Sequence, residues 1–326
     1  MPLPVRHATL PDMNEFELIA HYFRGWQGTH PDLILGQGDD CLIWHPSRAT
    51  VMSIDTAVAG RHFPEQATGA QAAQRAFLPA LSDIAAMGAE PAFFTLALTL
   101  PRPLNERWLD AFAGRLRELS ESYGLVLAGG DTTSGPGPVI SLQMHGLVDT
   151  PLRRDGVQPN DDLWVSGLPG RAAAVLPAVL NPAGASVPPD WLDAYWSPQP
   201  RLELGLRLIG LASAAIDVSD GLAADSGHLA RASGLDLLID IDSLPQAPSF
   251  EGYPKDQVTS WILSGGDDYE LAFTASPRQR QSLKALAAAL ALPLTRIGQA
   301  VAGDGQALIR HNGEVKALDQ AGFQHF

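Results

Sequence analysis

Three aspartates near the segment VSDGLAAD have the type and spacing to bind a cation. Asp217, Asp220 and Asp225 follow the apolar run LIGLASAAI and are separated by small residues. Burying one carboxylate is costly and neighbouring carboxylates repel one another, so a positive partner is expected. The alternative is a set of turn and helix-capping residues, because aspartate is common in both positions.

The same pattern recurs along the chain: a hydrophobic element is followed by an aspartate in a turn or at a helix edge that contains Gly or Ser. It occurs in LGQGDDCLIW, VMSIDTAV, ALSDIAAMG, LAGGDTTSG, AIDVSDG and LSGGDDYEL. Carboxylate ligands are typical of hard cations such as Mg²⁺, whereas a single cysteine and the lack of paired histidines argue against zinc. Glycines beside the aspartates let backbone N–H groups approach phosphate oxygens. We therefore expect a nucleotide phosphate bridged by metal ions.

Asp83 illustrates how a helix would offer such a ligand. A helical period places Phe77, Leu81 and Ile84 on one face and Asp83 beside it, at the edge of the core. An ordinary exposed helix position is the alternative for Asp83. The chain contains neither G-x-x-x-x-G-K-[ST] nor a His-Arg-Asp signature, so it is neither a P-loop enzyme nor a protein kinase of the usual type.

Composition places the chain among folded globular proteins. Of 326 residues, 45% are hydrophobic and 18% are charged, and the formal net charge is −14. No basic cluster is present, which argues against nucleic acid as the main partner. The apolar runs are too short to span a membrane, and we expect no membrane partner. Cys41 is the only cysteine and the first residues lack a signal-peptide core, so we predict a cytoplasmic protein.

Alternating helical and strand patterns predict an α/β or α+β fold. Residues 1–150 form the first predicted domain and residues 151–326 the second, with the crossing in RRDGVQPNDDLWVSGLPGRAA, whose Gly, Pro and Asp content indicates loops. Asn14 and Glu17 mark a helix start. The two GGD segments, at 129–131 and 265–267, are each expected to form a turn after a strand, a weak indication of two related halves.

Taken together, these segments resemble the thiamine-monophosphate kinase family. GQGDDCLIW, SIDTAVAGRHF, LSDIAAMGAEPAFFTLALTLP, GGDTTSGP, IDVSDGLAADSGHLARAS and LSGGDDYELAF occur in the family's order, and GFQHF ends the chain. The resemblance implies a two-domain, synthetase-like fold, with an N-terminal α/β domain that dimerises and a C-terminal α/β domain that completes the site. It also implies transfer of the γ-phosphoryl group of ATP to thiamine monophosphate, assisted by several Mg²⁺ ions.

The resemblance assigns site residues by their position in these segments. The implied metal ligands are Asp40, Ser53, Ile54, Asp55, Asp83, Asp131, Asp217 and Asp220. The implied ATP-binding residues are Gly130, Asp131, Arg154 and Ser219, and the implied substrate-binding residues are His62, Asp267 and Phe323. Asp39, Asp225 and Asp268 have weaker claims to bind metal or ligand, and capping or supporting roles are expected for them at least as much. No covalent nucleophile is expected, because the acceptor is itself an ionised phosphate.

Four residues depart from the family pattern. Ile54 replaces a threonine, so only its carbonyl oxygen is left to reach a metal. Asp267 replaces a glutamate, Phe323 replaces a tyrosine, and Ala113 stands where many relatives carry a tyrosine. These changes bear on affinity and substrate fit more than on the class of reaction.

Some roles and functions stay open at this level. The alternatives are an ordinary loop histidine for His62, a helix cap for Ser219 and a packing residue for Phe323. Arg154 is alternatively a solvated charge, with its neighbour Arg153 exchanging roles with it. Another ATP-dependent enzyme of the same superfamily, which includes aminoimidazole ribonucleotide synthetase, is the second functional hypothesis. A nucleotide-binding sensor without turnover is the third.

Overall fold

The computed structural model describes residues 13–26, 28–181 and 187–317. The chain divides into two compact units. One comprises Met1–Ala80 with Pro91–Leu147, and the other comprises Leu81–Glu90 with Val148–Phe326. Residues 81–90, which hold Asp83, are therefore grouped with the second half of the chain. The functional roles predicted for residues 1–150 and 151–326 remain predictions.

The first unit is built on a four-stranded sheet in the order β3-β6-β4-β5. Its strands are β3 (Ala49–Val58), β4 (Glu90–Leu100), β5 (Val126–Ser134) and β6 (Val139–Val148), and a short hairpin adds β1 (Leu33–Leu35) and β2 (Ile43–Trp44). Its helices are α1 (Glu15–Tyr22), α2 (Gly69–Ala86), whose last residues belong to the second unit, and α3 (Glu106–Ser122). The predicted start of α1 is confirmed, since Asn14 and Glu17 form a capping box.

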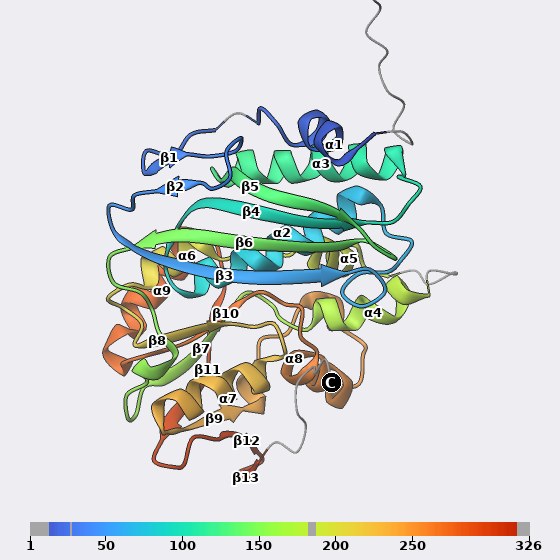
Figure 1. The fold of residues 1–326 in the computed structure, drawn as a ribbon. Helices are drawn as coiled ribbons and strands as arrows, with labels where there is room; N and C mark the ends of the chain where they lie inside the picture. Colours follow the sequence, from blue (N-terminus) through green and yellow to red (C-terminus); the bar gives the residue numbers. More distant parts are fainter. Residues whose placement is uncertain (1–12, 27, 182–186, 318–326) are drawn as a thin grey trace, which may run out of the picture. The chain divides into compact units, whose positions relative to one another are not determined.

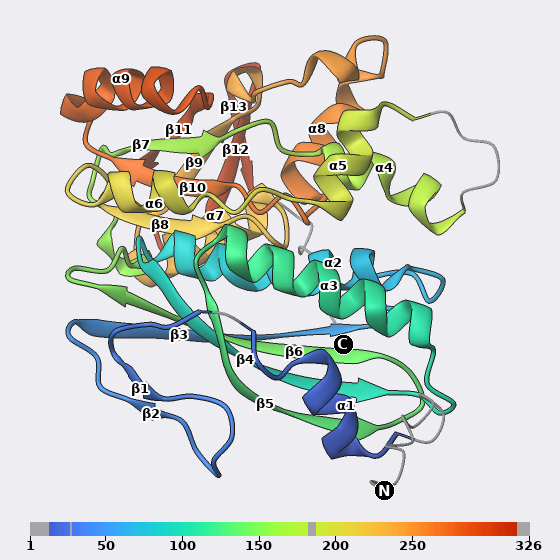
Figure 2. The same ribbon diagram turned by 90° about the horizontal axis from the view of Figure 1, so that it is seen from above.

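Helices α2 and α3 run along one face of this sheet (Figure 1, Figure 2). Phe77 on α2 packs edge-on against Phe94 on β4, with ring centroids 5.5 Å apart. The two helices approach closely at Gly69, where a Cβ atom would lie 1.9 Å from the carbonyl oxygen of Trp108. Pro79 lies inside α2, which is nevertheless a single helix. The long amphipathic pattern thus outweighs the cost of one proline.

His145 on β6 is buried in the first unit without hydrogen bonds. Its ring stacks on Phe93 at 4.1 Å, and neither ring nitrogen has a partner among the described residues. Burial lowers the pKa of the imidazole, because the charged form would lose its hydration. Burial therefore favours the neutral form of His145 in the folded protein.

This neutral histidine makes stability depend on pH. Above a pH of about 6.5, neither the folded nor the unfolded state protonates the ring, and no stability is lost. As the pH falls below that value, the unfolded chain takes up a proton that the folded chain resists, so stability decreases by up to about 1.4 kcal/mol per pH unit. We expect urea unfolding at pH 5.5 and 8 to show a smaller difference for His145→Leu than for the native protein. An equal difference in both proteins would contradict a neutral His145.

The second unit holds a seven-stranded mixed sheet in the order β13-β12-β9-β11-β7-β10-β8. Its strands are β7 (Asp162–Ser166), β8 (Ala214–Asp217), β9 (Asp236–Asp240), β10 (Leu271–Ala275), β11 (Leu294–Val301), β12 (Ala307–His311) and β13 (Glu314–Ala317). Its helices are α4 (Arg171–Leu180), α5 (Pro189–Trp196), α6 (Leu202–Leu208), α7 (Leu222–Ser233), α8 (Lys255–Ser264) and α9 (Arg280–Leu290). The predicted interdomain crossing therefore contains β7 and the start of α4.

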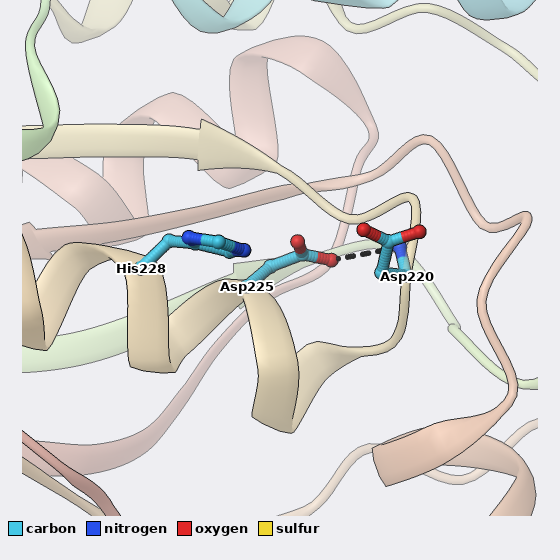
Figure 3. A group of neighbouring side chains, drawn as sticks. All are labelled: Asp220, Asp225 and His228. Atoms are coloured by element: carbon cyan, nitrogen blue, oxygen red, sulfur yellow. Dashed lines mark hydrogen bonds between the residues drawn. The ribbon is translucent and has the colours of Figure 1, made fainter. Parts of the chain in front are cut away.

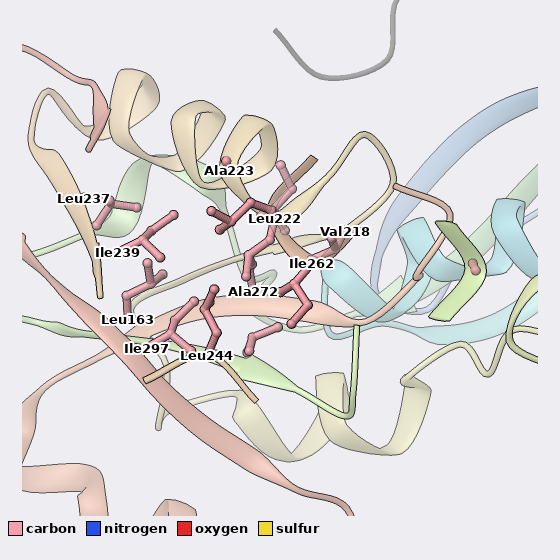
Figure 4. Close-up of a cluster of buried hydrophobic side chains, with 14 of the residues drawn as sticks. Leu163, Val218, Leu222, Ala223, Leu237, Ile239, Leu244, Ile262, Ala272 and Ile297 are labelled. Atoms are coloured by element: carbon pink, nitrogen blue, oxygen red, sulfur yellow. The ribbon is translucent and has the colours of Figure 1, made fainter. Parts of the chain in front are cut away.

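Alternate residues of β7 face two separate cores of the second unit. Leu163 and Val165 pack with residues of α4, α7 and α8 in the larger core, part of which is shown in Figure 4. Trp164 points to the other face, where it packs with residues of α6 and α9. Strand periodicity explains this arrangement, because successive side chains point to opposite faces of a sheet. With both faces covered, the ends of its central strands are held firmly in place.

Candidate active site

The predicted site residues fall into two groups, one in each unit. In the first unit, a cavity of about 250 Å³ is lined by Asp39, Asp40 and the β5 residues Gly129 to Thr132. Gly130 is required at this wall, since a Cβ atom there would lie 2.0 Å from the carbonyl oxygen of Leu96 on β4. A Cβ atom at Gly129 would meet nothing within 4 Å, so at these two glycines the wall is bare backbone that a phosphate-bearing ligand can approach closely. The cavity brings together Asp40, Gly130 and Asp131.

The GGD segment at 129–131 is part of a strand, so the predicted turn is wrong. Strand β5 pairs in parallel with β4 as far as Leu100 and Ser134, so Asp131 lies within the strand. The second GGD segment follows helix α8 rather than a strand. The two segments thus have different structures and do not support a repeat. Propensity favoured a turn at two glycines, but the sheet ladder continues through them.

Strand β3 presents Ser53, Ile54 and Asp55 alternately on its two faces. Ile54 is 67% exposed, whereas Ser53 and Asp55 on the opposite face are half-buried. The Oγ atom of Ser53 is buried and has no hydrogen-bond partner within the described part of the chain. A buried hydroxyl without a partner is uncommon, so this atom fits a ligand to an ion.

His62 lies just after β3 with its ring held against the backbone. The Nδ1 atom accepts a hydrogen bond from the N–H of Val58 at 3.0 Å. In the neutral ring the proton is therefore on Nε2, which makes that atom a donor. His62 lies in a turn, so the alternative of a loop histidine stays open beside the predicted substrate contact. Asp39, in turn, accepts the N–H of Asp40 through Oδ1 at 2.8 Å, which is a supporting role.

Two predicted residues occupy helices of the chain. Asp83 lies on α2 between the buried Ser82 and Ile84 and is itself half-buried, so it lies at the edge of the core as expected. Ala113 is buried on the inner face of α3. Phe323 lies outside the described residues.

In the second unit, β8 ends at the buried Asp217 and a tight loop leads to α7. Asp225, in the first turn of α7, accepts the N–H groups of Ser219 at 3.0 Å and Asp220 at 3.1 Å through Oδ2. Burial raises the pKa of the Asp225 carboxyl to about 7, and the two N–H donors oppose that shift. Asp225 is thus the residue that closes this loop. Ser219 does not cap α7, because the capping position belongs to Gly221.

His228 is a member of this group that the sequence analysis missed. One ligand atom from each of Asp220, Asp225 and His228 lies within 4.8 Å of the others. Figure 3 shows Asp225 between the other two side chains. The available signal was helical spacing, since residues three apart on a helix share a face. Partial burial and Arg231 lower the pKa of His228, and a guanidinium nitrogen of Arg231 lies 3.2 Å from Nδ1.

The two neighbouring arginines after β6 have different surroundings. Arg153 forms a two-point ion pair with Asp155, at 2.8 and 2.5 Å. Arg154 instead interacts electrostatically with Asp225 and His228. Arg154 is the arginine beside the Asp220 loop. These surroundings favour Arg154 over Arg153 for the predicted ATP contact.

The segment 265–270 is pinned to the Asp220 loop by backbone hydrogen bonds. The N–H of Asp267 bonds to the carbonyl oxygen of Ser219 at 2.9 Å, and the N–H of Tyr269 bonds to that of Val218 at 2.8 Å. Asp267 has a left-handed φ of 61°, and its Oδ1 accepts the hydroxyl of Tyr269 at 2.9 Å. The two loops thus form one continuous surface within the second unit.

Asp268 faces away into the interior of the second unit. Its Oδ1 accepts the N–H of Gly170 at 2.7 Å. Burial raises the pKa of the Asp268 carboxyl well above its usual range, and the Gly170 N–H opposes the shift. The expected supporting role is thus visible for Oδ1, whereas Oδ2 is buried without a hydrogen-bond partner among the described residues. Asp268 is one of the residues that line a second cavity of about 200 Å³.

Within the described ranges, no helix has both the length and the apolar character needed to cross a membrane.

Residues 38–148 match the family model described as AIR synthase related protein, N-terminal domain. The chain is 41% identical over 321 residues to thiamine-monophosphate kinase of Salmonella typhimurium, covering 96% of this chain and 98% of that protein.

Solved structures agree with this result. The crystal structure of thiamine-monophosphate kinase from Stenotrophomonas maltophilia K279a has a TM-score of 0.79 and 40% identity, covering 87% of this chain and 92% of that one. AaThiL complexed with AMPPCP and TMP has a TM-score of 0.77 and 26% identity, covering 85% and 87%. The expected two-domain α/β fold is thereby confirmed. The chain belongs to the thiamine-monophosphate kinase family.

Proposed function

We propose that this protein transfers the γ-phosphoryl group of ATP to the phosphate of thiamine monophosphate, which yields thiamine diphosphate and ADP. The observation that carries the proposal is the 41% identity to a thiamine-monophosphate kinase over nearly the whole of both chains. The cavity lined by Asp40, Gly130 and Asp131 supports it, because backbone and carboxylates there suit a metal-bound nucleotide. The relative that was solved with AMPPCP and TMP supports the same pair of ligands.

The donor set fits Mg²⁺. The proposed ligands are Asp40, Ser53, Ile54 through its carbonyl oxygen, Asp55, Asp83, Asp131, Asp217 and Asp220. All of them offer oxygen, and the unpartnered Oγ of Ser53 is suited to such a role. Bound Mg²⁺ would supply neutralising charge to the two phosphate-bearing substrates and hold their phosphates in line.

The chain's own residues position the reactants. Gly130 and Asp131 are the proposed ATP contacts of the first unit, and Arg154 and Ser219 are the proposed ATP contacts of the second unit. His62 is the proposed substrate contact of the first unit, and the hydrogen bond from the N–H of Val58 to Nδ1 orients its ring. An oxygen of the acceptor phosphate forms the new P–O bond as the bond to ADP breaks. No protein nucleophile is needed, because that oxygen is already ionised near neutral pH.

The direct test is incubation of the purified protein with Mg·ATP and thiamine monophosphate. We expect thiamine diphosphate and ADP in equal amounts, measured by chromatography. ADP without thiamine diphosphate would favour another ATP-dependent enzyme of the superfamily. Nucleotide binding without any turnover would favour a sensor.

Asp267→Glu restores the side chain that relatives carry and tests the substrate assignment. We expect the KM for thiamine monophosphate to change several-fold more than the KM for ATP, since the carboxylate would move relative to the substrate. Steady-state kinetics with each substrate varied in turn would measure both values. An effect confined to ATP would show that Asp267 faces the nucleotide.

We also propose a cytoplasmic homodimer that pairs through the first unit. The exposed side chains Met52 and Ile54 on β3, 63% and 67% accessible, support an apolar contact there. A single cysteine, exposed Cys41, supports a reducing compartment. Sedimentation experiments would measure the molecular masses of the native protein and of the Ile54→Asp variant. If the variant is still a dimer, the contact between protomers lies elsewhere.

A further inference from the structure

Ser233, the last residue of α7, bonds to a segment that is distant along the chain. Its Oγ atom donates a hydrogen bond to the carbonyl oxygen of Arg154 at 3.0 Å and accepts one from the N–H of Val157 at 3.2 Å. A serine in a helix can return its hydroxyl to a carbonyl oxygen one turn back in the same helix. The hydroxyl of Ser233 instead joins α7 to the segment that carries Arg154, a proposed ATP contact.

The segment around Arg154 is short and irregular, so its conformation depends on such bonds from outside. It contains one 3₁₀ turn, η2 (Arg154–Gly156), inside which the backbone of Asp155 leaves helical geometry with a φ of −92° and a ψ of 15°. Strand β8 supplies a second anchor, because the N–H of Ala215 bonds to the carbonyl oxygen of Arg153 at 3.2 Å. The carbonyl groups of both arginines are thus held, one by β8 and the other by α7.

Strand β8 and helix α7 also carry the predicted metal ligands of the second unit. Asp217 ends β8, and Asp220 lies in the loop that leads into α7. The side chain of Arg154 interacts electrostatically with Asp225 and His228, both in the first half of α7. The anchors on β8 and α7 therefore fix the place from which the Arg154 side chain reaches the Asp220 loop.

We infer that Ser233 is a positioning residue for nucleotide binding, which acts by fixing the backbone of Arg154. The inference rests on the proposed function, in which Arg154 contacts ATP. An arginine side chain has many rotamers, so its contact with a phosphate depends on where its backbone is held. Loss of the Ser233 hydroxyl should therefore weaken the binding of ATP and leave that of thiamine monophosphate unchanged.

The test compares Ser233→Ala with Ser233→Thr, which keeps the hydroxyl. We expect Ser233→Ala to raise the KM for ATP about fivefold, the effect of one hydrogen bond of ordinary strength, with the KM for thiamine monophosphate unchanged. Ser233→Thr should keep the native KM for ATP. Ser122→Ala is the matched control, because the hydroxyl of Ser122 bonds to the carbonyl oxygen of Leu119 within helix α3 at 2.8 Å. Both KM values should stay native in this control.

A double variant shows whether Ser233 acts through Arg154. Arg154→Ala should weaken the binding of Mg·AMPPCP, measured by calorimetry, and adding Ser233→Ala should weaken it no further, since two changes that remove one interaction are not additive. Additive losses, or native affinity in either single variant, would overturn the inference. Equal increases in the KM for both substrates would overturn it too, because they indicate a general loss of structure.

The same measurements separate this inference from the proposed function. If the native protein binds Mg·AMPPCP but forms no thiamine diphosphate, the proposed function fails, and the binding data for the single and double variants still decide the role of Ser233. If the native protein does not bind Mg·AMPPCP, both fail. If thiamine diphosphate is formed and Ser233→Ala keeps the native KM for ATP, the inference fails while the proposed function stands.

Discussion

We expect Asp220→Asn to lower kcat for thiamine diphosphate formation by about a thousandfold, with the fold intact. Asp220 lies in the loop after β8, and its N–H is held by Asp225 at 3.1 Å, so that loop geometry survives the substitution. The amide removes a negative charge from a proposed metal ligand. Loss of charge stabilisation worth about 4 kcal/mol in the transition state corresponds to that reduction in rate. Single-turnover assays at saturating Mg·ATP would measure it.

Asp225→Asn is the matched comparison in the same loop. The remaining amide oxygen can accept the N–H groups of Ser219 and Asp220, and the native carboxyl already has a pKa of about 7. We therefore expect a far smaller loss of kcat than for Asp220→Asn. Equal losses in the two variants would contradict this division of roles and make Asp225 a ligand as well. Raising the Mg²⁺ concentration should partly restore Asp220→Asn if metal affinity is what was lost.

Glu270→Ala should reduce the free energy of unfolding by about 3–5 kcal/mol. Glu270 is 3% exposed and accepts two hydrogen bonds from Arg201 and a third from the hydroxyl of Ser166 at 2.5 Å. Ser166 then accepts the N–H of Leu271 at 2.9 Å, so the carboxylate anchors β7 to β10. Alanine removes the carboxylate that accepts two hydrogen bonds from the Arg201 guanidinium, whose side chain is only 21% exposed, and losing one member of a buried ion pair is costly. Urea unfolding followed by circular dichroism would measure the change.

Two further variants separate this cause from simple loss of packing. Asp155→Ala breaks the exposed pair with Arg153 and should leave the unfolding midpoint nearly unchanged, because solvent screens that interaction. Adding Arg201→Met to Glu270→Ala should recover part of the lost stability, since the unpaired charge is then removed. A double variant as unstable as the sum of both single changes would contradict the assignment.

Some elements could be predicted because their signals are local. The capping box at Asn14 and Glu17 and the apolar stripe of α2 each lie within a few turns of helix. The GGD segments were misjudged for the opposite reason. Glycine favours a turn locally, but the parallel pairing of β5 with β4, far away in sequence, keeps Asp131 inside a strand.

The sequence by itself predicted the chemistry: many carboxylates, glycines beside them, one cysteine and no paired histidines favour a hard cation and a phosphate. It also determined the family, through the order of those segments. Only the tertiary structure decided which aspartates do which task. Asp225 closes a loop, Asp268 accepts the N–H of Gly170, and Asp40 shares a cavity wall with Asp131. Burial and hydrogen-bond partners set these roles, and both depend on residues that are distant along the chain.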